Sequence, residues 1–185
     1  MLLLYFTTAM NSYFNGIWKD TNYQFLKYSG YNLVDYVNNQ RPDSVLDVGC
    51  GYNRLKGKIH HLIGIDPYND CADMKISLEQ LVTDPDDKVY TKSAFDIVLC
   101  LGSINFGNEK NIDNQLRLLY PLFRKEMIFR VNPGIPHRGV EGIEWFGWSQ
   151  KKIYAVARKY NYTVKDLKME YTEQNDLRYY FVYAK

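Results

Sequence analysis

The chain has 185 residues, of which 46% are hydrophobic and 24% are charged, and this composition predicts a single globular unit. Its net charge of +2 is too small to indicate a surface for nucleic acid or for an anionic membrane. Residues 1–10 are apolar but lack a basic start and a cleavage pattern, and they fall short of the about 20 apolar residues that span a bilayer. We therefore expect a cytoplasmic protein without a membrane anchor.

The predicted elements alternate between helix and strand along the chain. Residues 11–39 interleave aromatic and aliphatic side chains and predict one or two helices, which end at the sequence RPDS. The pattern then predicts strands at 45–48, 62–65, 74–76, 96–101 and 126–132, a turn of helix at 78–82, helices at 111–124 and 148–160, and an antiparallel hairpin of 163–174 with 177–185. Such alternation is typical of an α/β fold whose mostly parallel sheet is covered on both faces. Ligands of these sheets bind beyond the carboxyl ends of the strands.

A glycine turn follows the first predicted strand, in the sequence VLDVGCG at residues 45–51. Gly49 and Gly51 permit tight backbone geometry and close approach of a ligand, and Asp47 ends the strand beneath them. Asp66 ends the next strand, where a carboxylate can accept hydrogen bonds from a ribose. A simple turn followed by an Asp-Pro strand terminator is the alternative explanation. The combination of strand, glycine turn, strand and acid favours a nucleotide site.

The nucleotide is not a typical dinucleotide, because Arg54 stands where the fingerprint G-x-G-x-x-G/A has its third small residue. No G-K-[ST] follows, which argues against a Walker A loop. The motif VLDVGCG instead resembles the first motif of class I S-adenosylmethionine-dependent methyltransferases, and LIGIDP at 62–67 resembles their second. The sequences FDIVLCLGSINF and MIFRVNPG and the terminal hairpin continue the resemblance in the right order, over residues 42–185.

This resemblance implies a three-layer α/β sandwich around a seven-stranded sheet of order 3-2-1-4-5-7-6, with strand 7 antiparallel. It implies S-adenosyl-L-methionine as the cofactor, with the glycines near its methionine part, Asp47 near its amino group and Asp66, next to Pro67, on its ribose. Ser77, where the family often has an acid, and Leu78 would line the adenine. The family's positions after the fourth strand correspond to Leu101, Gly102 and Ser103, with residues 104–107 beginning the acceptor side. Residues 1–41 would form a helical segment on that side, ahead of the methyltransferase-like unit 42–185.

The connector at residues 52–61 is at the lower length limit for a parallel crossover. We therefore expect its helix to be shortened to a turn or two, or replaced by a loop, which would leave the cofactor pocket more open on that side. Arg54 and Lys56 in this connector either point into solvent or reach the cofactor carboxylate.

Methyl transfer needs positioning and a dry site, and it needs a base only if the acceptor loses a proton. His137, in the loop after the fifth predicted strand, is the best general-base candidate, with Glu141 and Glu144 as fallbacks. Aromatic residues of the same loop and of the N-terminal helices suit a planar or apolar small molecule, whereas LGSINF after the fourth strand argues against methylation of base amines. The three cysteines lack metal-ligand spacing, and we expect no metal.

Three functions remain open at this point. The first is a methyltransferase that acts on a small molecule. The second is a catalytically silent module of the same fold that binds S-adenosylmethionine or another protein, because fold does not fix function. The third is a nicotinamide-dependent oxidoreductase, which Arg54 and the terminal hairpin disfavour. The sequence does not identify the methyl acceptor or the oligomeric state.

Overall fold

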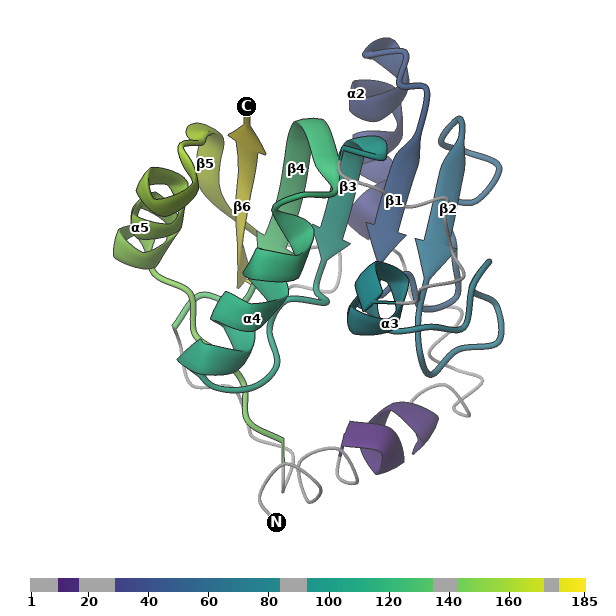
Figure 1. Ribbon diagram of the computed structural model, residues 1–185, viewed down its shortest axis with the longest axis horizontal. Helices are drawn as coiled ribbons and strands as arrows, with labels where there is room; N and C mark the ends of the chain where they lie inside the picture. Colours follow the sequence, from purple (N-terminus) through teal and green to yellow (C-terminus); the bar gives the residue numbers. More distant parts are fainter. Residues whose placement is uncertain (1–9, 17–28, 84–92, 135–142, 172–176) are drawn as a thin grey trace.

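A computed structural model describes residues 10–16, 29–83, 93–134, 143–171 and 177–185. In this part of the chain a six-stranded sheet has the order β2-β1-β3-β4-β6-β5 (Figure 1). Its strands are β1 (Val45–Val48), β2 (Leu62–Ile65), β3 (Phe95–Leu101), β4 (Phe123–Val131), β5 (Thr163–Tyr171) and β6 (Leu177–Ala184). Neighbouring strands are parallel except at β6, which is antiparallel to both β4 and β5. The α/β class, the mostly parallel sheet and the terminal hairpin are thereby confirmed.

The prediction of a strand at residues 74–76, which would have been the seventh of the sheet, was wrong. Among the described residues this strand is reduced to one parallel bridge between Met74 and Ile65, on the outer side of β2. Backbone hydrogen bonds join Asp73 and Met74 to Gly64 and Asp66 there, and the Gly64 amide itself donates to the Asp73 carboxylate at 2.8 Å. The strand order otherwise agrees with 3-2-1-4-5-7-6, with the bridge in the place of strand 3.

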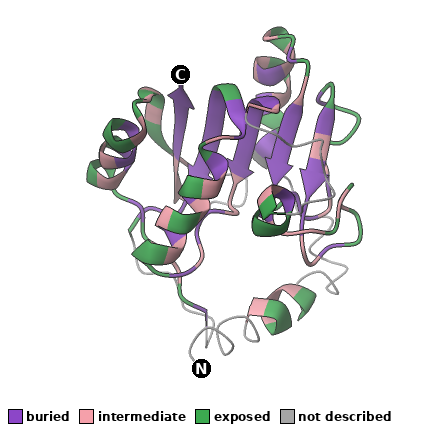
Figure 2. Ribbon diagram, in the orientation of Figure 1, coloured by how far each residue is buried: buried purple, intermediate pink, exposed green. Residues whose placement is uncertain are grey.

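Helices cover both faces of the sheet. Three lie on one face, namely α3 (Leu78–Thr83), α4 (Glu109–Leu119) and α5 (Gln150–Tyr160), and their apolar side chains join the larger core cluster. The 3-10 helix η2 (Ser29–Leu33) and α2 (Val34–Asn39) pack on the other face, where Leu33 and Val37 join a second cluster. Figure 2 shows the central strands as the buried layer between these helices, whereas the edge strand β5 is exposed or intermediate along its length. These are the three layers expected from the sequence.

The connector between β1 and β2 contains turns and no α-helix, as its length predicts. Its Leu55 and Ile59 are buried and join the second core cluster, so they supply part of the apolar surface that a crossover helix would bury. The connector is also fastened by hydrogen bonds. Asn38 of α2 donates to the Lys58 carbonyl at 2.8 Å and accepts from the His60 amide at 3.0 Å.

The N-terminal residues 10–16 are helical and lie beyond the carboxyl ends of β1, β2 and β3 (Figure 1). They therefore approach the edge of the sheet at which a ligand of a parallel sheet binds. No helix of the described residues is long and apolar enough to cross a membrane.

Candidate functional site

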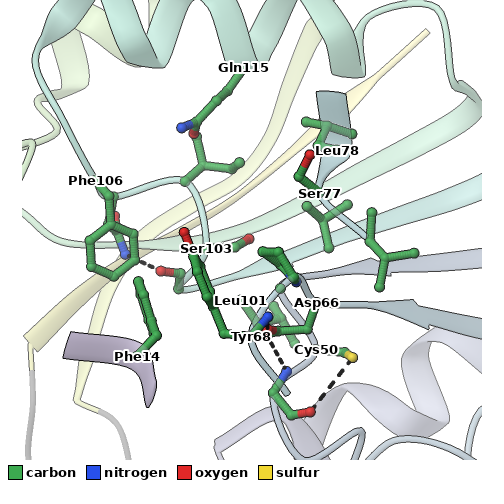
Figure 3. Close-up of a pocket in the computed structure, with 18 of the residues that line it drawn as sticks. Phe14, Cys50, Asp66, Tyr68, Ser77, Leu78, Leu101, Ser103, Phe106 and Gln115 are labelled. Carbon is green, nitrogen blue, oxygen red and sulfur yellow. Dashed lines mark hydrogen bonds between the residues drawn. The ribbon is translucent and has the colours of Figure 1, made fainter. Parts of the chain in front are cut away.

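A cavity of about 850 Å³ opens at the carboxyl ends of the parallel strands. Its volume lies within the range of small-molecule and cofactor sites. Figure 3 shows how its walls are arranged: Phe14 and Phe106 lie on one side, Ser77 and Leu78 on the opposite side, and Gln115 points inward from α4. Nine of the ten residues that the sequence assigns to a cofactor line this cavity: Gly49, Gly51, Asp66, Pro67, Ser77, Leu78, Leu101, Gly102 and Ser103.

Asp47, the tenth of these residues, lies behind the cavity wall in the middle of the sheet. Its side chain is buried, and its Oδ2 atom has no hydrogen-bond partner among the described residues. Burial, together with the nearby Asp66 carboxylate, raises the pKa of Asp47 to about 7. A buried carboxylate with an unpaired oxygen is costly, which indicates a group that is completed by a cationic or hydrogen-donating ligand, directly or through water.

Asp66 has the opposite surroundings, because three backbone amides donate to it. Tyr68 and Asn69 donate to Oδ1 at 2.8 and 3.1 Å, and Gly51 donates to Oδ2 at 3.0 Å. Burial raises the pKa of Asp66, and these three hydrogen bonds oppose the rise. A carboxylate has about four acceptor sites, so Asp66 keeps one of them on Oδ2 for a ligand hydroxyl. The same bonds hold the glycine turn against the end of β2.

The glycine turn brings the ends of β1 and β3 together. Gly49 has a φ of +69°, and a Cβ atom there would come within 2.6 Å of the Ser103 Cβ. Only glycine combines that backbone conformation with such a close approach. The turn thus places the residues after β3 directly beside the residues after β1, on one wall of the cavity.

Ser77 serves as the N-cap of α3. Its hydroxyl accepts from the Gln80 amide at 3.1 Å, and the Gln80 side chain accepts from the Ser77 amide at 2.8 Å. This reciprocal pair satisfies amides at the start of the helix. The Ser77 hydroxyl proton is still available to a ligand, and Leu78 places an apolar side chain beside it on the cavity wall.

The two basic residues of the connector have different surroundings. Lys56 pairs with Asp73 at 2.8 Å and donates to the Leu62 carbonyl, which commits its ammonium group to the connector. Arg54 lines the cavity, and its guanidinium lies 5.6 Å from the centre of the Tyr52 ring. Of the two, only Arg54 is placed to meet an anionic group of a ligand.

A chain of aromatic rings crosses the mouth of the cavity. Phe14 stacks on Tyr68 and meets Phe106 edge-on, each with ring centres 5.0 Å apart. Phe106 lies 4.6 Å from Trp145, which in turn meets Tyr13 at 6.2 Å. Residues from four distant parts of the chain thus form one apolar surface. Tyr68 was missed as a site residue, because nothing in the sequence shows that its ring meets Phe14 from a distant part of the chain.

Polar residues at the inner end of the cavity were also missed. Gln115 on α4 and Asn132 after β4 line it, as does Arg130. The periodic pattern of α4 marks Gln115 only as a position between core residues, and nothing in the sequence indicates that it faces a cavity. Arg130 is buried and paired with Glu170 at 2.7 Å, and it also donates to the Asn32 side chain.

Of the three residues considered as general bases, one lies in the described part of the chain. His137 and Glu141 lie outside the described residues. Glu144 is described and exposed, and its backbone carbonyl accepts from the Gly107 amide at 2.8 Å. No group of three or more metal-ligating side chains comes together in the part of the chain that the structure describes.

Neither a comparison with protein-family models nor one with curated proteins gave a match. Solved structures do match. One is the 1,6-didemethyltoxoflavin-N1-methyltransferase of Burkholderia thailandensis, with a TM-score of 0.71, 13% identity and coverage of 97% of this chain and 88% of that chain. Magnesium protoporphyrin IX methyltransferase of Synechocystis has a TM-score of 0.65 at 13% identity, with 97% and 99% covered.

A third structure is an S-adenosylmethionine-dependent methyltransferase of Thermotoga maritima, described as a possible histamine N-methyltransferase. Its TM-score is 0.54 at 14% identity, with 82% of this chain and 87% of that chain covered. These likenesses extend over most of each chain. The chain therefore has the fold of the class I S-adenosylmethionine-dependent methyltransferases.

Proposed function

We propose that this chain is an S-adenosylmethionine-dependent methyltransferase that acts on a small-molecule acceptor. The observation that carries the proposal is the cavity itself, where the glycine turn, Asp66 and the residues after β3 meet above the unpaired oxygen of Asp47. Two of the similar structures, from Burkholderia and Synechocystis, contain S-adenosylhomocysteine, which supports the choice of cofactor.

The residues present fit the parts of this cofactor. Asp66 has an acceptor site for a ribose hydroxyl, and the Ser77 hydroxyl and the Leu78 side chain suit the adenine. Asp47 complements a cationic amino group, and Arg54 complements a carboxylate. The glycine turn lets the backbone approach the chain of atoms between those two groups. One amino-acid moiety and one nucleoside are thus matched by separate walls of one cavity.

When bound, the cofactor supplies an electrophilic methyl group on a sulfonium, which passes to a nucleophilic atom of the acceptor as the sulfur becomes a neutral thioether. The chain contributes position and exclusion of water. Phe14, Phe106 and Trp145 form an apolar surface at the mouth of the cavity. The residues after β3 lie between that surface and the residues proposed to bind the cofactor. For an acceptor that loses a proton, we propose His137 as the base.

The test is transfer of an isotopically labelled methyl group. Purified protein is incubated with methyl-labelled S-adenosylmethionine and pools of small aromatic and heteroaromatic molecules, and the small-molecule fraction is analysed for label. We expect labelled product that depends on intact protein and is reduced in Asp66→Ala. Cofactor binding without transfer to any pool would favour the catalytically silent module, and absence of cofactor binding would reject both.

A further inference from the structure

One part of the cavity wall has no role in the proposed cofactor site. It consists of Gln115 on α4, Asn132 after β4, and the rings of Phe106 and Trp145. This wall lies beyond Ser103, on the side where an acceptor must reach the transferred methyl group. Its chemistry therefore describes the acceptor, and the inference rests on the proposed function.

The wall is built as a fixed surface. Asn105 joins its parts through its side chain. The Nδ2 atom donates to the Gly102 carbonyl at 3.0 Å, and the Oδ1 atom accepts from the backbone amide of Asn132 at 2.9 Å. Its backbone carbonyl accepts from Phe146 at 2.8 Å, and the Trp148 indole donates to the Ile104 carbonyl at 2.9 Å. The end of β3, the end of β4 and the segment 143–148 are thus held together before any ligand binds.

Two polar atoms on this wall lack hydrogen-bond partners among the described residues. They are the Asn132 Nδ2 atom, in a residue that is 2% exposed, and the Gln115 Oε1 atom. Buried polar groups are nearly always paired, so two unpaired ones in residues that line one cavity favour a ligand with complementary groups. Asn132 thus presents a donor and Gln115 an acceptor, and turning both amides over exchanges the two roles while keeping one donor and one acceptor.

The polar side chains of this wall favour a ligand that is uncharged where it meets them. Both side-chain amides are uncharged at every pH. The cation nearest to Asn132 in sequence, Arg130, is already balanced by Glu170 and donates to Asn32. A carboxylate or phosphate would be better matched by a basic side chain; Arg54, Arg117 and Arg178 line the same cavity but are not part of this wall. The aromatic rings add a shape requirement, because Phe106 and Trp145 lie 4.6 Å apart and present ring surfaces that suit a planar molecule.

We propose that the methyl acceptor is a neutral, planar heteroaromatic molecule whose edge carries a carbonyl group beside an N–H or O–H group. Asn132 donates a hydrogen bond to the carbonyl, and Gln115 accepts one from the N–H or O–H. The aromatic wall of Phe106, Trp145 and Phe14 holds the plane of the ring.

The test measures binding of three matched bicyclic probes in the presence of saturating S-adenosylhomocysteine. 2-Quinolinone carries the proposed edge, 1-methyl-2-quinolinone lacks its N–H, and quinoline-2-carboxylate replaces the edge with an anion. We expect 2-quinolinone to bind about tenfold more tightly than either of the others, because each mismatched probe leaves a buried polar group unpaired. Gln115→Leu and Asn132→Leu are each expected to remove this preference, whereas Lys110→Leu, which changes an exposed residue of α4, retains it.

A thermal readout separates recognition from a structural role. Replacing an unpaired buried amide by leucine is expected to leave the melting temperature unchanged or to raise it, whereas Asn105→Leu, which removes made hydrogen bonds, lowers it. Absence of 2-quinolinone binding, tighter binding of the carboxylate, or a preference that survives both substitutions would each overturn the proposal. S-adenosylhomocysteine binding is titrated separately, so that failure of the cofactor site is recognised as such.

Discussion

Asp47 and Asp66 are neighbouring buried carboxylates at the ends of β1 and β2, but their surroundings differ. Three backbone amides stabilise the charge of Asp66, while the Oδ2 atom of Asp47 has no partner among the described residues. The charge of Asp47 is therefore costly until a cation approaches. We propose that Asp66 both holds the glycine turn and binds the ribose, and that the ionisation of Asp47 responds to the cofactor.

A pH dependence of cofactor binding follows from Asp47. Its pKa is raised to about 7 in the unliganded protein, so it is protonated and neutral below that pH. We expect the affinity for S-adenosylmethionine to increase as the pH is raised through about 7, with protons released on binding. Calorimetric titrations in buffers of different ionisation enthalpy measure both quantities. An affinity and a proton count that do not change across this range would exclude Asp47 from cofactor binding.

Asp47→Asn is the matched variant, and it separates stability from binding. Because the pKa of Asp47 is higher in the folded protein than in the unfolded chain, the folded state holds more protons, and stability falls as the pH rises from the ordinary value of 3.8 to about 7. Because asparagine does not ionise, the stability of the variant lacks the part of this pH dependence that comes from Asp47. We expect it to be more stable than the wild type above pH 7, by roughly 1–3 kcal/mol, and to bind the cofactor more weakly.

The connector between β1 and β2 is the element that departs most from an ordinary crossover. Asp73, at the outer side of β2, stabilises it by accepting from the Gly64 amide at 2.8 Å and from the Asn53 side chain at 3.2 Å. Lys56 completes the cluster through its ion pair. This arrangement binds the turns of the connector to the strand that follows them, and it occupies the position where a third strand would otherwise pair.

Asp73→Ala is therefore expected to destabilise the protein by roughly 1–3 kcal/mol, the scale for several partly buried hydrogen bonds to a charged group. Asp70→Ala is the matched control, because the Asp70 side chain is 88% exposed and its pairing with Lys75 contributes little. Urea unfolding of both variants measures the difference. Equal stability of the two variants would show that Asp73 does not fasten the connector.

The sequence predicts elements well where local chemistry determines them. The bounds of β1 and β2 agree with their apolar runs, and the absence of a crossover helix follows from the length of the connector. The helix α4 begins at Glu109, two residues before its expected start, because Asn108 and Asn111 form a capping box there. The prediction of a third strand was wrong in its extent: pairing with β2 is limited to a bridge at Met74, and the Gly64 amide donates to the Asp73 side chain.

The site was predictable to the extent that its residues follow strands. Gly49, Asp66 and Ser103 each come directly after a buried apolar run, so topology brings them to one edge. No sequence pattern of this kind indicates that Gln115 or Asn132 lines the cavity. The stacking of Phe14 on Tyr68 also depends on the whole fold, because the two residues are distant in sequence. Sequence patterns thus locate the residues proposed to bind the cofactor, whereas those proposed to bind the acceptor are found only from the tertiary structure.

At the scale of the whole molecule, one cavity joins a nucleotide-type wall to an aromatic and amide-lined wall. Structures at 13% identity have a similar fold over 97% of this chain. Packing and topology therefore preserve the fold, while the side chains around the cavity decide the reaction and its acceptor. The central claim is that this cavity binds S-adenosylmethionine.

The most direct test of that claim is a calorimetric titration of the wild type with S-adenosylhomocysteine and with NAD. We predict binding of S-adenosylhomocysteine at one site per chain and none of NAD. We also predict a loss of about 1.5–3 kcal/mol of binding free energy in Asp66→Ala, the scale of hydrogen bonds to a charged group. Asp66→Asn, which keeps the shape of the side chain, guards against a loss caused by unfolding of the turn. Absence of S-adenosylhomocysteine binding to the folded wild type, or wild-type affinity in both variants, would contradict the account.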